Sequence, residues 1–138
     1  MRLLTVVGNR PQFIKSAPLS VALRDVGIEE VVVHTGQHWD PALSAVFFDE
    51  LELHEPAVTL DLRTADTSTI EAALRAAIVG RIPDAVLVYG DTNSTLAGAR
   101  AGAGLPVAHV EAGLRSGDLS MPEERNRIEV DGISSYLF

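Results

Sequence analysis

The chain has 138 residues, 46% of them apolar, which gives room for a single domain over residues 1–138 with a sizeable core. It contains no cysteine, which excludes disulfides, iron–sulfur clusters, Cys-ligated zinc and a thiol nucleophile. Lys15 is the only lysine among 11 basic residues, and the net charge of −8 argues against a nucleic-acid or anionic-membrane surface. No apolar run approaches the roughly 18 residues of a membrane span, so we expect a soluble, cytoplasmic protein.

Short apolar runs alternate with helical stretches along the chain. In order, the pattern predicts a strand at 3–7, helices at 11–16 and 18–26, a strand at 31–34, a helix at 40–51, a strand at 57–60, a helix at 66–79, a strand at 85–89, a helix at 92–102, a strand at 107–110 and a helix at 122–135. Pro18 is expected to divide the first helical stretch. This alternation indicates an α/β fold with a doubly wound parallel sheet. Residues 136–138 resemble the start of another strand, so we expect the natural protein to be longer.

Ligands of doubly wound sheets bind beyond the carboxyl ends of the strands, and the first candidate site follows the strand at 3–7. Gly8 and Asn9 are followed by Arg10 and by Pro11, and proline suits the first turn of a helix. Such a helix start can bind phosphate, with Arg10 and Lys15 as added cations. An ordinary turn with charges facing solvent explains the spacing equally well.

Acidic residues follow two further predicted strands. Asp91 comes directly after the strand at 85–89 and either caps the next helix or points into the crevice. Glu111 follows the strand at 107–110; it shares a strand face with His109, and Arg115 is a possible structural partner. If these strands are neighbours, the two carboxylates line one wall of the crevice and suit acid and base roles.

Two more segments carry polar residues of interest. Ser120 and Glu123 fit a capping box at the start of the last helix. Gln37 and His38 close a strand and could face the crevice. His34 and His38 straddle a strand–loop junction rather than sharing a helix face, so no metal site is predicted.

Five motifs in this order resemble the non-hydrolysing UDP-N-acetylglucosamine 2-epimerases. They are GNRPQFIK (residues 8–15), TGQH (35–38), GDTNSTLAG (90–98), HVEAGLR (109–115) and MPEERNR (121–127). The resemblance runs through essentially the whole chain but covers only the first of that family's two Rossmann-like domains, which are arranged as in GT-B glycosyltransferases. The second, UDP-binding domain is absent from this sequence. One departure is the segment 62–67, which replaces a Gly/Gln-rich stretch found in many members.

The resemblance implies interconversion of UDP-GlcNAc and UDP-ManNAc through elimination and re-addition of UDP, without a nicotinamide cofactor or a catalytic metal. By motif matching, the catalytic acids are Asp91, Glu111 and Glu123. Arg10 and Lys15 correspond to residues that face the diphosphate or steady a carboxylate. Three further residues match positions that bind the substrate or line an activator site in the family: Gln37, His38 and Arg115. The full-length family form is expected to be a homodimer.

Two alternatives stay open at this stage. A hydrolysing relative would use the same carboxylates but release free ManNAc and UDP. A non-catalytic fragment would at most bind a nucleotide sugar weakly, because one domain supplies a single wall of a two-walled cleft.

Overall fold

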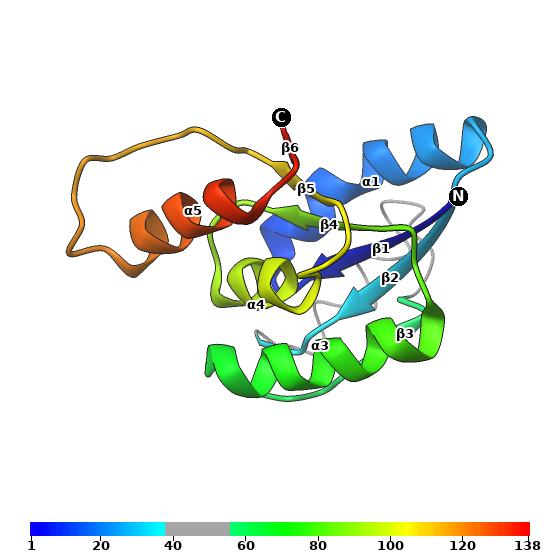
Figure 1. The fold of residues 1–138 in the computed structure, drawn as a ribbon, viewed down its shortest axis with the longest axis horizontal. Coiled ribbons are helices and arrows are strands. Elements are labelled where there is room, and N and C mark those ends of the chain that lie inside the picture. Colours follow the sequence, from blue (N-terminus) through cyan, green and yellow to red (C-terminus); the bar gives the residue numbers. More distant parts are fainter. Residues whose placement is uncertain (38–55) are drawn as a thin grey trace.

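The computed structural model describes residues 1–37 and 56–138, which form a parallel sheet covered by helices on both faces (Figure 1). Its six strands run in the order β3-β2-β1-β4-β5-β6, and every neighbouring pair is parallel. The strands are β1 (Arg2–Val7), β2 (Glu29–His34), β3 (Val58–Thr59), β4 (Ala85–Tyr89), β5 (Val107–Val110) and β6 (Tyr136–Leu137). The doubly wound α/β fold predicted from the sequence is therefore confirmed.

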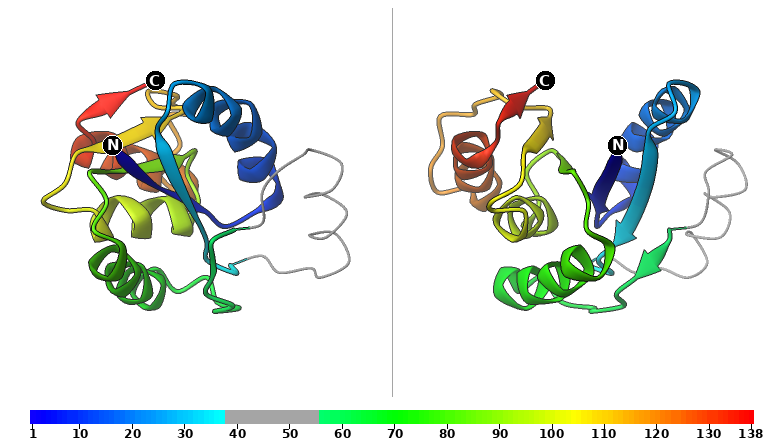
Figure 2. Two further views of the ribbon diagram at one scale, coloured as in Figure 1. Left: turned by 90° about the vertical axis from the view of Figure 1, so that its right-hand side faces the viewer. Right: turned by 45° about the vertical axis from the view of Figure 1, so that its right-hand side comes forward.

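The described helices are α1 (Arg10–Asp25), α3 (Thr67–Arg81), α4 (Asn93–Ala101) and α5 (Pro122–Ile133), and they divide between the two faces of the sheet (Figure 2). Phe13 of α1 packs with Leu3, Leu87 and other side chains of one face. The opposite face contributes to a larger core with buried apolar residues of α3, α4 and α5: Ile70, Leu74, Leu96 and Val130. The alternation of side chains along each strand sends neighbouring residues into these two cores.

One helix boundary differs from the prediction. Helix α1 is continuous through Pro18 instead of being split in two. Pro18 lies on the exposed side of α1, as does Ile14 one turn earlier, so the carbonyl group that loses its helical partner can bind water. The expected end at Gly27 is confirmed, since Gly27 follows α1 with φ 75°. The predicted helix at 40–51 and His38 lie outside the described residues.

The carboxyl ends of β1, β4 and β5 meet at one edge of the sheet. Tyr89 pairs with Val110 in register, so the turns after β4 and β5 leave the sheet at the same level. The turn after β1 leaves from the neighbouring strand on the other side of β4. The segments that carry Arg10, Asp91 and Glu111 are thereby brought together. None of the helices in the described ranges has the length and apolar character of a bilayer span.

Candidate active site at the carboxyl edge of the sheet

Gly90 joins the turns after β4 and β5. Its N–H donates to the Val110 carbonyl at 2.9 Å, and its own carbonyl accepts from His109 Nε2 at 2.7 Å. Its φ of 67° lies in the left-handed region, and a Cβ atom added there would lie 3.3 Å from Glu111 Oε2. The carboxylate of Glu111 therefore lies against Gly90, the residue that precedes Asp91.

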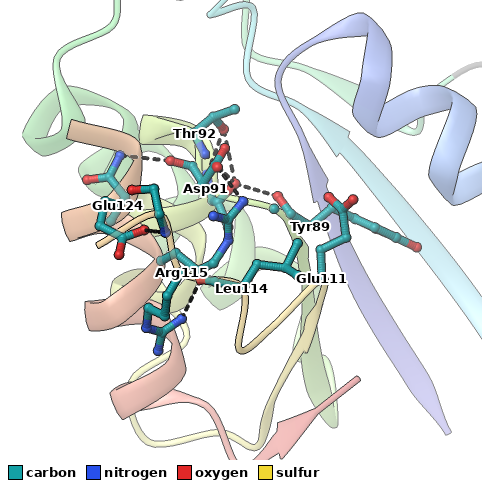
Figure 3. A network of polar contacts seen from close by, with 12 residues as sticks. Tyr89, Asp91, Thr92, Glu111, Leu114, Arg115 and Glu124 are labelled. Atoms are coloured by element: carbon teal, nitrogen blue, oxygen red, sulfur yellow. Dashed lines mark hydrogen bonds and ion pairs between the residues drawn. The ribbon is translucent and has the colours of Figure 1, made fainter. Parts of the chain in front are cut away.

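Glu111 is paired with Lys15 of α1, with 2.5 Å between Nζ and Oε2. Arg115, the possible structural partner, pairs with Asp131 instead, and Figure 3 shows the Glu111 and Arg115 side chains pointing apart. The predicted common face with His109 is also wrong. Glu111 has a φ of 69°, which ends the strand alternation and turns its side chain toward α1, while His109 contacts α5 on the opposite face.

Asp91 is directed to α5 instead of capping α4. The N-cap of α4 is Thr92, whose side chain accepts from the Thr95 N–H in a capping box. The Asp91 carboxylate forms an ion pair with Arg127, and its backbone carbonyl accepts from Asn126 Nδ2 at 3.0 Å. The capping interpretation is therefore wrong, because the adjacent threonine takes that position.

Glu123 and Glu124 have different surroundings in the first turn of α5. Glu124 is buried and its carboxylate accepts from the N–H groups of Ser116 and Gly117 at 3.0 and 3.1 Å. These bonds, led by that from Ser116, outweigh desolvation and lower the pKa of Glu124. Glu123 is exposed and lies one turn before Arg127, on the helix face that contacts Asp91. The predicted Ser120–Glu123 capping box is not formed: the N-cap is Met121, without a side-chain cap.

A buried glutamine connects the β1 and β4 turns. Gln12 Oε1 accepts from the Gly8 N–H at 2.6 Å, and Nε2 donates to the Tyr89 carbonyl at 2.8 Å and to Thr95 Oγ1 at 2.9 Å. The sequence reasoning assigned no role to Gln12. The feature that could have indicated its role is its position beside the apolar Phe13, on the side of the first helical turn that faces the sheet.

Gln37 lies at the N-terminus of α4. Its Oε1 accepts from the Ser94 N–H at 2.9 Å and from Ser94 Oγ at 2.6 Å, and Ser94 Oγ lies 2.8 Å from Thr35 Oγ1. Only a glycine fits at position 8, since an added Cβ would lie 2.2 Å from Ser94 Oγ. These contacts place Gln37 beside the turn after β1, near the start of α1.

The start of α1 itself is partly capped. Asn9 Oδ1 accepts from the Gln12 N–H at 3.1 Å, and Arg10 follows as an exposed residue. Over residues 1–37 and 56–138, no three His, Asp or Glu side chains gather in a way that could hold a metal ion.

Arg115 and His109 converge on Asp131 of α5. Asp131 Oδ2 accepts from Arg115 at 2.6 Å and from the Gly113 N–H at 3.0 Å, while Oδ1 lies 2.7 Å from His109 Nδ1. Burial works to raise the pKa of Asp131, but these hydrogen bonds together outweigh it and lower that pKa. Sequence reasoning missed Asp131, because nothing local marks this helix residue as a partner of the β5 end.

Comparison with known proteins decides the family. The sequence model of UDP-N-acetylglucosamine 2-epimerase matches residues 22–138. The chain belongs to this family. It is 49% identical to a UDP-N-acetylglucosamine 2-epimerase homolog of Methanococcus maripaludis and 46% identical to the UDP-2,3-diacetamido-2,3-dideoxy-D-glucuronate 2-epimerase of Pseudomonas aeruginosa.

Solved structures give the same result. The UDP-GlcNAc 2-epimerase of Methanocaldococcus jannaschii, in complex with UDP-GlcNAc and UDP, matches with a TM-score of 0.93 at 40% identity, over all of this chain and 40% of that one. The Neisseria meningitidis UDP-GlcNAc 2-epimerase bound to UDP-GlcNAc matches with a TM-score of 0.91 at 33% identity, over all of this chain and 39% of that one. The two curated relatives are likewise matched over the full chain but only 40% and 41% of their own length. The chain thus corresponds to about 40% of the length of these epimerases.

Proposed function

We propose that the protein containing this chain is a UDP-N-acetylglucosamine 2-epimerase that interconverts UDP-GlcNAc and UDP-ManNAc. The observation that carries the proposal is the placement of Asp91 and Glu111 on either side of Gly90, each with a cationic partner from another element. Family membership supports it, and so do the neighbours named as complexes with UDP-GlcNAc.

The reaction needs a proton taken from C2 and one returned to the opposite face of the sugar. In the proposed route a carboxylate removes the C2 proton, the electron pair forms a C1–C2 double bond, and the C1–oxygen bond to UDP breaks. UDP then adds back at C1 while C2 receives a proton on the other face. Asp91, Glu111 and Glu123 are the proposed catalytic acids and bases.

The proposed substrate-binding residues lie around the turns that carry Asp91 and Glu111. Arg10 and Lys15 lie at the start of α1, and a diphosphate placed there would meet both cations and the helix N-terminus. Gln37 borders the same turn through Ser94. Arg115 is half-exposed and donates to Asp131 and to the Leu114 carbonyl. His38, the other proposed position, lies outside the described residues.

The chain spans about 40% of the length of the curated relatives, so the whole-protein properties are part of the proposal. We propose that catalysis needs the remaining part, which would supply the second wall of the cleft. On this basis residues 1–138 alone turn over no UDP-GlcNAc. We further propose that the full-length protein is a cytoplasmic homodimer, with no nucleic-acid or membrane partner and no bound cofactor.

The Pseudomonas aeruginosa relative favours one further candidate substrate. That protein is named for the 2-epimerisation of a UDP-linked diacetamido glucuronate, and it is 46% identical to this chain. The chemistry at C2 would be the same, and the sugar would differ at C3 and C6. The hydrolysing alternative gains no support, because the relatives described above are named as 2-epimerases.

A single assay tests both the reaction and its residues. The full-length protein is incubated with UDP-GlcNAc in D₂O, and the products are analysed for deuterium at C2 and for free sugar. We expect deuterated UDP-ManNAc, and a loss of rate on the order of 10²-fold or more in Asp91→Asn and Glu111→Gln. Glu129→Gln, which removes an exposed carboxylate paired with Arg100, serves as the matched control. Free ManNAc, or normal rates in both variants, would refute the assignment, and preference for the diacetamido glucuronate would identify the alternative substrate.

A further inference from the structure

The side chain of His109 is fully buried between two hydrogen-bond acceptors. Nε2 lies 2.7 Å from the Gly90 carbonyl oxygen, and Nδ1 lies 2.7 Å from Asp131 Oδ1. A carbonyl oxygen can only accept, so Nε2 carries a hydrogen. An ionised carboxylate can also only accept, so Nδ1 carries a hydrogen whenever Asp131 is charged.

The surroundings of Asp131 favour its charged form. Its other oxygen accepts from the Arg115 guanidinium and from the Gly113 N–H, and its side chain is only 8% exposed. A buried carboxylate that accepts from a cation and from a backbone N–H group is stabilised as an anion. Three charged groups surround this arrangement: Asp131 of α5, which contacts His109, Arg115, which pairs with Asp131, and Glu111, whose carboxylate lies against Gly90.

We propose that Asp131 is a positioning residue that holds His109 with a hydrogen on both ring nitrogens, and that His109 thereby fixes the Gly90 carbonyl and the turn carrying Asp91. The first half stands on hydrogen-bond geometry alone, whereas the second half rests on the proposed epimerase function. Gly90 lies between the Glu111 carboxylate and Asp91, so a hydrogen bond that holds its carbonyl also holds the turn that carries Asp91.

Nitrogen NMR of the full-length protein with ¹⁵N-labelled histidine tests the first half. The His109 signals are assigned by their absence in His109→Gln. Near neutral pH we expect two protonated ring nitrogens in the wild type and a single one, Nε2, in Asp131→Asn. A neutral His109 ring in the wild type would overturn the proposal whether or not the protein is an epimerase.

Kinetics of the same variant test the second half. We expect Asp131→Asn to lower kcat by about 10- to 100-fold with little change in KM, because a small displacement of Asp91 impairs proton transfer more than binding. Glu129→Gln, on the same helix, should keep both constants. An unchanged kcat in folded Asp131→Asn would overturn the positioning role, whereas an inactive wild type would refute the proposed function and leave the NMR result to decide the state of His109.

Discussion

Lys15 of α1 and Glu111 at the end of β5 form an ion pair between residues 96 positions apart in the sequence, with 2.5 Å between Nζ and Oε2. The pair connects the turn after β1 to the turn after β5, across the top of β4. It gives Glu111 a fixed position next to Gly90, and it places a cation where a diphosphate is proposed to bind.

Replacing Lys15 by methionine removes this cation and keeps the length of the side chain. We expect kcat/KM of the full-length protein for UDP-GlcNAc to fall about 10-fold or more, since a hydrogen bond to a charged group contributes about 1.5–3 kcal/mol. The free energy of unfolding should change by less than about 1 kcal/mol, because both side chains are partly exposed. Arg75→Met, which breaks the pair with Glu71 on α3, is the control. Unchanged kcat/KM in Lys15→Met would contradict the proposed role of this pair.

Gly90→Ala tests the junction between the two acids. The left-handed φ costs an alanine about 1–2 kcal/mol, and the new Cβ would lie 3.3 Å from Glu111 Oε2. Gly27→Ala is a matched control, with φ 75° and no atom within 4 Å of the added Cβ. We expect a similar loss of stability in both variants by chemical denaturation, and a fall in kcat only for Gly90→Ala. Equal kcat values would show that the position of Glu111 over Gly90 does not matter for turnover.

Local patterns predicted the frame of this domain but not its long-range ion pairs. The five strands predicted from apolar runs and the helices at 66–79, 92–102 and 122–135 all occur with shifts of a few residues. Short apolar segments between helices specify buried parallel strands almost without regard to tertiary contacts. The alternation also predicts that Asp91 and Glu111 leave the sheet at the same edge, whereas the pairing of their strands, β4 and β5, is known only from the structure.

The errors have a common physical cause. Asp91 and Thr92 are both good N-cap residues, and the choice between them depends on Arg127, which is 36 positions away. Arg115 is a possible partner of Glu111 because the two are close in sequence, yet the left-handed backbone at Glu111 turns its side chain to Lys15. Pro18 was given its usual helix-breaking role, but exposure of that side of α1 lets water replace the lost hydrogen bond. Each outcome depends on the tertiary surroundings of the residue, which a local window does not contain.

Glu123 and Glu124, which are adjacent in α5, should respond differently to replacement by glutamine. Glu124→Gln loses a buried acceptor of the Ser116 and Gly117 N–H groups, so we expect a lower melting temperature and faster proteolysis of the 112–121 segment. Glu123→Gln changes an exposed side chain one turn before Arg127, the partner of Asp91, so we expect an unchanged melting temperature and a kcat lowered by about 10²-fold. Thermal unfolding and steady-state kinetics of the two variants check this. Normal turnover in Glu123→Gln would remove that residue from the proposed catalytic set.

His34 should make the stability of the protein depend on pH. Burial lowers its pKa from 6.5 to about 4, with Asp61 acting weakly in the opposite direction. Between these values the unfolded chain binds a proton that the folded chain does not, so stability is complete above pH 6.5 and falls as the pH is lowered toward 4. The loss should reach up to about 1.4 kcal/mol per pH unit. In His34→Phe, which keeps a ring beside Phe13 but cannot titrate, urea denaturation between pH 7 and pH 5 should show a flatter dependence. A slope equal to that of the wild type would mean that His34 keeps its ordinary pKa in the folded protein.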